Sequence, residues 1–222
     1  MSSNASIDFL EMLKGGSSKS LIAVIDTETN WRDEVMSIGI AVADAKTFKC
    51  QDTRYYIIDP EYRVGGIYSN VLHYSREKKH VTFGVTIESG ANSNVTREIM
   101  LSRRQALQDI DKYLRDNGIT KIFAYNGKFD LGHLKELSHF EWYDIMRIAA
   151  YKQFNGAITE DMPCCKTGRL KTNYGVEPIT RMLSGDKRYT EVHNAVYDAV
   201  DELRIIELLG HVLEDYECAR IN

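Results

Sequence analysis

The sequence predicts an α/β fold in which a mixed β-sheet is flanked by α-helices. Three β-rich runs follow one another near the beginning of the chain, at residues 21–25, 35–43 and 53–58. Helical and strand-like segments then alternate until a final helix with one apolar stripe. Strands in succession, followed by helices and strands in alternation, are typical of a sheet that helices cover.

The three early runs have the composition of buried strands. The first is continuously apolar, the second is rich in small and β-branched residues, and the third ends in Tyr-Tyr-Ile-Ile. Short connections separate the runs, so we expect three consecutive strands. Residues 1–20 are expected to form an N-terminal leader or short helix, with the helix at 7–13 and a break at Gly15-Gly16.

Residues 60–100 have no clear period and predict an inserted loop region or active-site flap within one domain that spans 21–222. An extended segment is expected at 81–87. The basic side chains of Arg76, Lys78 and Lys79 could contact phosphates, although a solvated loop explains them equally well.

Regular structure returns after this region. In order, we expect a helix at 102–117, a buried strand at 121–125, helices at 128–138 and 145–154, an irregular stretch at 156–172 and a last helix at 194–217. Gly118 ends the first of these helices. The last one has apolar residues at helical spacing, which predicts a buried stripe.

The composition excludes some classes of protein. Of the 222 residues, 43% are hydrophobic and 27% are charged, which fits one globular core. No run of about 18 apolar residues is present, so we expect no membrane partner. Four cysteines without C-x-x-C spacing predict reduced thiols and a cytoplasmic protein. A net charge of -4 means that any nucleic acid must be held by a local patch or by metal ions.

The first chemical motif is Asp26-Thr27-Glu28, at the end of the first strand. Side chains two residues apart in a strand point to the same face, so both carboxylates could bind one metal cluster. A D-x-E triplet is common by chance, and a strand-end turn capped by polar side chains explains it as well.

The second motif runs from Asn126 to Asp130, where a strand stops and a helix begins. A carboxylate in the first turn is stabilised by the helix dipole. That stabilisation is also the alternative explanation, with Asn126 as a helix cap and Asp130 as a partner of the dipole.

The third motif is His193 followed by Asp198, at the start of the last helix. The small residues Ala195 and Ala199 would let this helix approach the sheet closely. Taken singly, a cap histidine and a solvated aspartate explain the motif better than a catalytic site does.

Together the three motifs are specific, because each lies at the boundary of an element where α/β sheets build their sites. In this order they resemble the DEDD superfamily of exonucleases, histidine (DEDDh) subtype. The resemblance implies a ribonuclease H-like fold, two divalent cations (Mg²⁺ or Mn²⁺) and 3′-to-5′ release of nucleoside 5′-monophosphates.

The resemblance also implies the role of each motif residue. Four carboxylates would hold the metals, and the histidine would be the general base: Asp26, Glu28, Asp130, Asp198 and His193. Thr27, Phe129 and Asn126 would contact the terminal nucleotide, although a place in the core explains Phe129 equally well. Four crowded carboxylates repel one another unless cations neutralise them, which independently predicts metal binding.

The expected partner is the 3′ end of single-stranded DNA or RNA, with DNA slightly favoured, and a homodimer is expected only from the resemblance. Two other functions stay open: an inactive module that binds nucleic-acid ends, and a hydrolase of short oligonucleotides or small nucleotides. His133 is interpreted as a surface histidine outside the site, and Asp144 as a structural residue that opens the following helix.

Overall fold

The computed structural model describes residues 20–74 and 97–222. The short helix expected at 7–13, the extended segment expected at 81–87 and the basic residues Arg76, Lys78 and Lys79 lie outside these ranges. Among the described helices, none combines the length and the apolar character that crossing a membrane requires.

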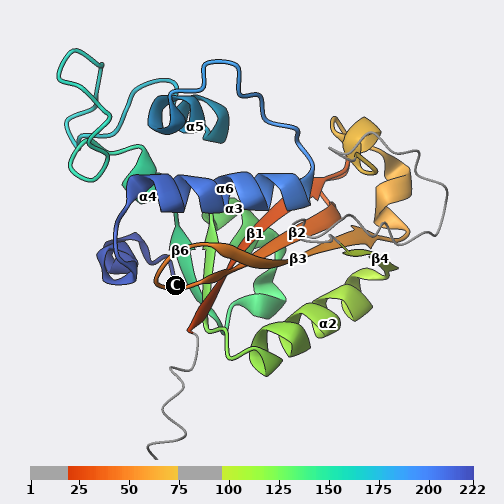
Figure 1. Cartoon of the computed structure of the whole chain (residues 1–222). Coiled ribbons are helices and arrows are strands. Elements are labelled where there is room, and N and C mark those ends of the chain that lie inside the picture. The colour runs from red at the N-terminus through yellow and green to blue at the C-terminus, as the bar shows by residue number, and fades with distance from the viewer. Residues whose placement is uncertain (1–19, 75–96) are drawn as a thin grey trace, which may run out of the picture.

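A six-stranded mixed sheet forms the centre of the fold (Figure 1). Its strands are β1 (Leu21–Thr29), β2 (Val35–Asp44), β3 (Cys50–Ile58), β4 (Arg97–Leu101), β5 (Lys121–Ala124) and β6 (Glu141–Asp144). Across the sheet the order is β4-β3-β2-β1-β5-β6. β2 is antiparallel to both β1 and β3, whereas β5 is parallel to β1 and β6, and β4 is parallel to β3. The predicted mixed sheet is confirmed.

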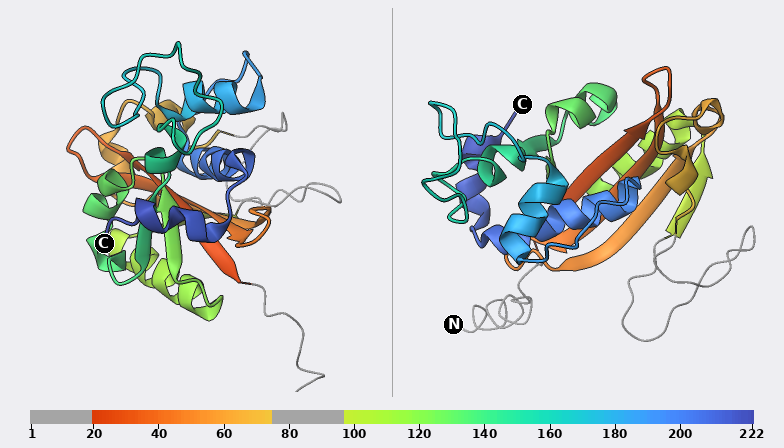
Figure 2. Two further views of the ribbon diagram at one scale, coloured as in Figure 1. Left: turned by 90° about the vertical axis from the view of Figure 1, so that its left-hand side faces the viewer. Right: turned by 90° about the horizontal axis from the view of Figure 1, so that it is seen from above.

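The two faces of the sheet carry separate cores. Ile22 and Val24 of β1 belong to the cluster that includes α6 (Ala195–Leu209), whereas Ala23 and Ile25 belong to the cluster that includes α2 (Arg103–Asp116). Figures 1 and 2 show α6 and α2 on opposite sides of the sheet. The alternation of side chains along β1 therefore assigns its odd and even positions to different layers.

The helix predicted at 128–138 is interrupted. The structure has α3 (Lys128–His133), followed by a 3-10 turn, η3 (Lys135–Leu137). Leu134 between them leaves helical geometry, with φ −117° and ψ 44°, and its side chain is fully buried. The helix does not continue because the leucine side chain is buried in the core between the sheet and α2.

The helix predicted at 145–154 is also too long. Only α4 (Met146–Ala149) is helical. Beyond it, Tyr151 forms an isolated bridge with Arg169, and the Leu170 N–H donates to the Ala150 carbonyl at 2.9 Å. These bonds to the irregular stretch take the place of further helical turns.

The final helix ends earlier than predicted. Gly210, with φ 70°, closes α6 in the left-handed conformation, and the chain then forms η4 (Leu213–Ala219). Leu213 continues the apolar spacing but packs on the core from η4. A further helix, α5 (Val176–Ser184), was not predicted, although the apolar Val176 and Ile179 that it buries have helical spacing.

The expected inserted region is partly regular. It contains η1 (Glu61–Val64) and η2 (Ser69–Val71), and its last residues form β4 on the edge of the sheet. The segment from η1 to η2 lies beside the end of β1, since a Cβ atom on Gly66 would lie 2.6 Å from the Thr29 carbonyl oxygen. This contact places residues 61–74 next to the first motif.

Candidate active site

β1 carries the first motif inside the strand rather than after it. Asp26 and Glu28 continue the series of Ile22 and Val24, so both point to the face that α6 covers. Thr27 points to the opposite face. There its Oγ1 donates a 2.8 Å hydrogen bond to Oδ1 of Asp130.

α6 brings the third motif against these carboxylates because β2 has a glycine at the crossing point. Gly39 is the register partner of Asp26. A Cβ atom on Gly39 would lie 2.0 Å from the backbone carbon and oxygen of Ala195, the first residue of α6. The close approach expected from small residues is therefore present. It leaves Asp198 only 3% exposed beside β1.

The second motif reaches the site from the other side of β1. Asn126, with φ 61°, turns the chain from β5 into α3, and its N–H donates to Oδ1 of Asp144 at 3.0 Å. Asp144 also accepts from the Met146 N–H at 3.1 Å, in keeping with a structural role. Asp130 follows in the first turn of α3 and is 2% exposed.

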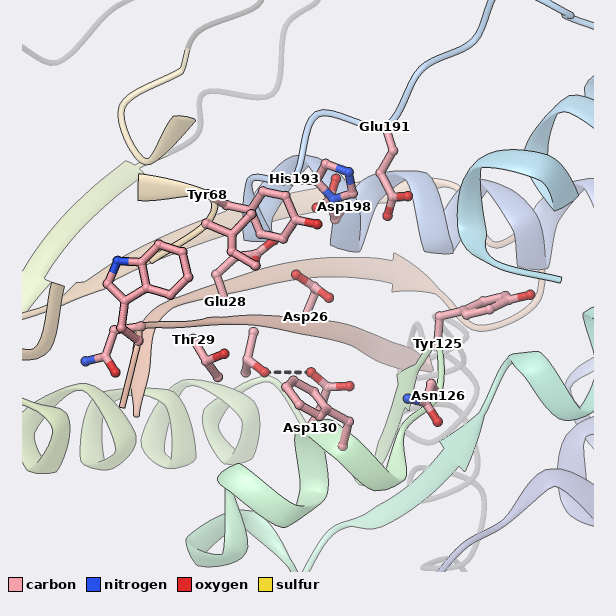
Figure 3. Close-up of a pocket in the computed structure, with 15 residues that line it drawn as sticks. Asp26, Glu28, Thr29, Tyr68, Tyr125, Asn126, Asp130, Glu191, His193 and Asp198 are labelled. Carbon is pink, nitrogen blue, oxygen red and sulfur yellow. Dashed lines mark hydrogen bonds between the residues drawn. The ribbon is translucent and has the colours of Figure 1, made fainter. Parts of the chain in front are cut away.

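All eight residues singled out from the sequence line one cavity of about 490 Å³. They are Asp26, Thr27, Glu28, Asn126, Phe129, Asp130, His193 and Asp198. Figure 3 shows Asp26 between the Asp130 side of this cavity and the α6 side, where His193 and Asp198 lie. Three stretches that are distant in the sequence thus face the same space. We call Asp26, Glu28, Asp130 and Asp198 the acidic floor.

Burial raises the pKa values of three carboxylates of the acidic floor, and repulsion between carboxylates adds to the effect at Asp26 and Glu28. Desolvation raises the pKa of Asp26 well above its ordinary value, and the neighbouring carboxylates raise it further. The pKa of Glu28 rises to about 9, through burial and then repulsion from Asp198. Burial raises the pKa of Asp130 to about 7, against the hydrogen bond from Thr27. Such a cluster is costly when ionised, and cations would relieve it.

The donor set suits a hard divalent cation. Glu28, His193 and Asp198 offer ligand atoms within 4.8 Å of one another. Asp26 stands outside this trio, but its buried Oδ2 has no hydrogen-bond partner among the described residues. Carboxylate oxygens are the ligands that Mg²⁺ and Mn²⁺ prefer. The orphaned oxygen and the raised pKa values therefore fit a site for bound cations.

His193 lies at the edge of the floor on the loop before α6. Burial lowers its pKa below the ordinary value, although the charge of Glu177 opposes this effect. A neutral imidazole at neutral pH can accept a proton.

Three residues near the floor were not anticipated. Glu191 and Tyr68 line the cavity, and burial raises the pKa of Glu191 to about 7. Glu202 lies one helical turn after Asp198, is fully buried and accepts the Tyr125 N–H at 3.0 Å. Helical spacing from Asp198 could have revealed Glu202. No sequence signal pointed to Tyr68.

The mouth of the cavity is apolar and exposed. Trp31 is 68% exposed, Ile67 is 67% exposed and Phe129 is 42% exposed, and all three line the cavity. We call them the apolar rim. His133 contacts the ring and carbonyl oxygen of Phe129 and lies 3.1 Å from Asp33, so it supports the rim from outside.

No protein-family model and no curated protein sequence matches this chain. Its fold, however, is similar to solved structures. A 3′-exonuclease solved for 3′-end-specific recognition of a histone mRNA stem-loop aligns with a TM-score of 0.55 and 13% identity, over 93% of this chain and 71% of that one. The nuclease domain of 3′hExo, a DEDDh family member bound to rAMP, aligns with a TM-score of 0.53 and 16% identity, over 93% and 98%.

A full-length 3′-exonuclease aligns with a TM-score of 0.54 and 12% identity, over 90% of this chain and 84% of that one. At these identities the likeness concerns the arrangement of the backbone. The mixed sheet and its flanking helices agree with these nuclease domains. The chain therefore has the ribonuclease H-like fold of the DEDDh nuclease domains.

Proposed function

We propose that this chain is a DEDDh-type 3′-to-5′ exonuclease that hydrolyses the terminal phosphodiester bond of single-stranded nucleic acid and releases nucleoside 5′-monophosphates. The observation that carries the proposal is the convergence of Asp26, Glu28, Asp130, Asp198 and His193 on one cavity. The likeness to 3′-exonuclease structures supports the direction of cleavage. We also propose that residues 21–222 form a single exonuclease domain.

The acidic floor would hold two divalent cations, Mg²⁺ or Mn²⁺. Such cations, when bound, lower the cost of forming hydroxide and neutralise charge on the attacking and leaving oxygens. Asp26 occupies the central position, with Glu28 and Asp198 on one side and Asp130 on the other. Each carboxylate would be kept ionised by the cations that it binds.

The other cavity residues would position the substrate and move the proton. His193 is neutral near pH 7 and would accept the proton of the attacking water. Phe129 and Asn126 also line the cavity and would contact the terminal nucleotide. Thr27 would act mainly by holding Asp130, to which it donates.

The apolar rim favours a single-stranded nucleic acid over a small nucleotide as the substrate. Bases of a single strand have exposed faces, and aromatic side chains bind such faces with little dependence on sequence. The sequence slightly favours DNA, whereas the neighbouring structures include an mRNA stem-loop complex and a complex with rAMP. The test below therefore uses both sugars.

The test follows 5′-labelled single-stranded DNA and RNA of one sequence with Mg²⁺, Mn²⁺ or EDTA. We expect a metal-dependent ladder that shortens from the 3′ end. Asp26→Asn and His193→Ala should each reduce the rate by at least about 100-fold, since metal placement and general-base catalysis are lost. Asp161→Asn is the matched control and should retain the rate, because Asp161 is exposed and does not line the cavity.

Two other outcomes would overturn the proposal. Binding of 3′ ends without turnover would identify an inactive end-binding module. Hydrolysis of dinucleotides with intact long strands would identify a hydrolase of short oligonucleotides.

A further inference from the structure

The imidazole of His193 lies face to face with the phenol ring of Tyr68. The ring centroids are 4.1 Å apart, and the two planes differ by 16°. Figure 3 shows the two rings next to each other above the carboxylates. Aromatic rings in such contact attract each other beyond the effect of burial alone. Tyr68 belongs to the segment 61–74, which contains η1 and η2 and is distant from His193 in the sequence.

This contact matters because the imidazole has no hydrogen-bonding partner among residues 20–74 and 97–222, and the charge of Glu177 acts on it without a hydrogen bond. No residue in these ranges forms a hydrogen bond or ion pair with its nitrogens. A histidine that acts as a base is ordinarily oriented by a third group. In this protein the group that contacts the imidazole in this way is the face of the Tyr68 ring.

The backbone at His193 also needs external support. Its φ is 60°, in the left-handed region that residues other than glycine seldom adopt. The next residue, Asn194, is 1% exposed, and its Nδ2 donates to the carbonyl oxygens of Val71 at 2.8 Å and Leu72 at 3.1 Å. These bonds tie the His193 loop to the segment that carries Tyr68.

That segment is in turn attached to the catalytic strand. The Gly66 N–H donates to Oγ of Ser69, and Gly66 packs so closely on Thr29 that a side chain would clash with its carbonyl oxygen. The segment that carries Tyr68 is therefore packed against the end of β1, the strand that carries Glu28.

We propose that Tyr68 is a positioning residue that holds the imidazole of His193 by its ring face, ready to accept the proton of the attacking water. This inference rests on the proposed exonuclease function. The ring face carries the role, and the hydroxyl group does not. A flat aromatic substitute should therefore preserve it, whereas an aliphatic side chain of similar bulk should not.

The kinetic test compares Tyr68→Leu, Tyr68→Phe and Tyr62→Leu. Tyr62 lies in the same segment, packs on the core and does not line the cavity, so its variant controls for loosening of the segment. We expect Tyr68→Leu to lower kcat by about 10- to 100-fold with little change in KM, because a misplaced base loses part of its contribution. Tyr68→Phe and Tyr62→Leu should stay within about twofold of the wild type, since each keeps the ring face beside His193.

A double-mutant cycle separates positioning from substrate binding. In a protein that already carries His193→Ala, adding Tyr68→Leu should cause no further loss of kcat. A raised KM that persists in the His193→Ala background would show that Tyr68 binds a base of the substrate, and would overturn the inference. An equal loss in Tyr68→Phe would assign the role to the hydroxyl group and overturn it as well.

Proton NMR detects the contact between the two rings without requiring turnover. The ring current of Tyr68 should shift the imidazole proton resonances of His193 upfield, and Tyr68→Leu should return them downfield, while Tyr62→Leu leaves them in place. Unchanged resonances in an active protein would overturn the positioning role alone. An inactive wild-type protein would overturn the proposed function, and the positioning role with it.

Discussion

The acidic floor and the apolar rim form one cavity, but they are built in opposite ways. The floor is buried on strand and helix positions, with Asp130 and Asp198 almost inaccessible to solvent. The rim comes mainly from connecting segments, and Trp31 and Ile67 expose about two thirds of their surface. The positions of the floor carboxylates thus depend on how the core packs, whereas the positions of the rim side chains depend mainly on the loops attached to that core.

Under the proposed function, this difference divides the tasks of the site between the floor and the rim. Ionised carboxylates in the floor cost folding free energy, which is tolerable only where cations stabilise them or where the core holds them in place. Exposed apolar side chains in the rim cost little, and they offer surface to a substrate. We therefore expect changes in the floor to affect catalytic rate and stability, and changes in the rim to affect binding.

The largest effect should come from Gly39→Ala, which disturbs the floor without altering a carboxylate. The added methyl group would overlap the backbone of Ala195, so α6 must move away from the sheet and carry Asp198 with it. A displacement of this kind should lower kcat by about 100-fold or more. Overpacking should also cost about 1–3 kcal/mol of unfolding free energy.

Gly156→Ala is the matched control, because a Cβ atom there would meet nothing within 4 Å. Activity measurements and thermal unfolding of both variants decide the matter. If Gly39→Ala unfolds like the wild type and cleaves at the same rate, the close approach of α6 does not position the site.

The next effect concerns the stability of the metal-free protein. The raised pKa values of Glu28, about 9, and Asp130, about 7, mean that the folded state retains protons that the unfolded chain loses. The contribution of these two groups to the free energy of unfolding is then fully present below about pH 4 and is lost as the pH rises through their folded-state pKa values. In EDTA we expect Tm to fall by roughly 5–10 °C between about pH 5.5 and about pH 8.5.

Saturating Mg²⁺ or Mn²⁺ should remove most of this fall, since cations stabilise the ionised carboxylates. Glu28→Gln should flatten the profile in EDTA because it removes one of the titrating groups. A metal-free protein whose Tm rises over this pH range would contradict the expected repulsion in the floor.

The smallest effect should follow Trp31→Ala in the rim. Stacking of a base on an aromatic side chain contributes about 1–3 kcal/mol, and for an exposed ring we expect the lower end of this range, which raises KM by about 5- to 10-fold. Trp31 is exposed and does not belong to the acidic floor, so kcat and Tm should change little. Steady-state kinetics on a single-stranded oligonucleotide measures both constants.

Val212→Ala provides the control, as Val212 is another exposed apolar residue, 58% accessible, and lies outside the cavity. A lower kcat with unchanged KM in Trp31→Ala would show that the rim is coupled to the chemistry of the floor. That result would remove the division of tasks proposed here.

Local patterns in the sequence identified much of the fold. Continuous apolar runs and helical periodicity located β1, β2, β3, β5, α2 and α6, because those elements pack on the core over several turns or residues. The helices predicted from such patterns at 128–138 and 145–154 were too long. Leu134 left the helix to enter the core, and Ala150 bonded to Leu170 instead of to the next turn. Both departures result from contacts distant in the sequence.

The residues that could make the site are readable from local sequence. Asp26 and Glu28 share a strand face by period two, and Asp130 and Asp198 each belong to a motif at a helix start. That these motifs meet is a property of the folded chain, because α6 can approach the sheet only where β2 has Gly39. The tertiary structure also placed Tyr68 on the imidazole of His193 and brought Glu202 close enough to Asp26 to raise its pKa. Such contacts join residues far apart in the chain, and no local spacing encodes them.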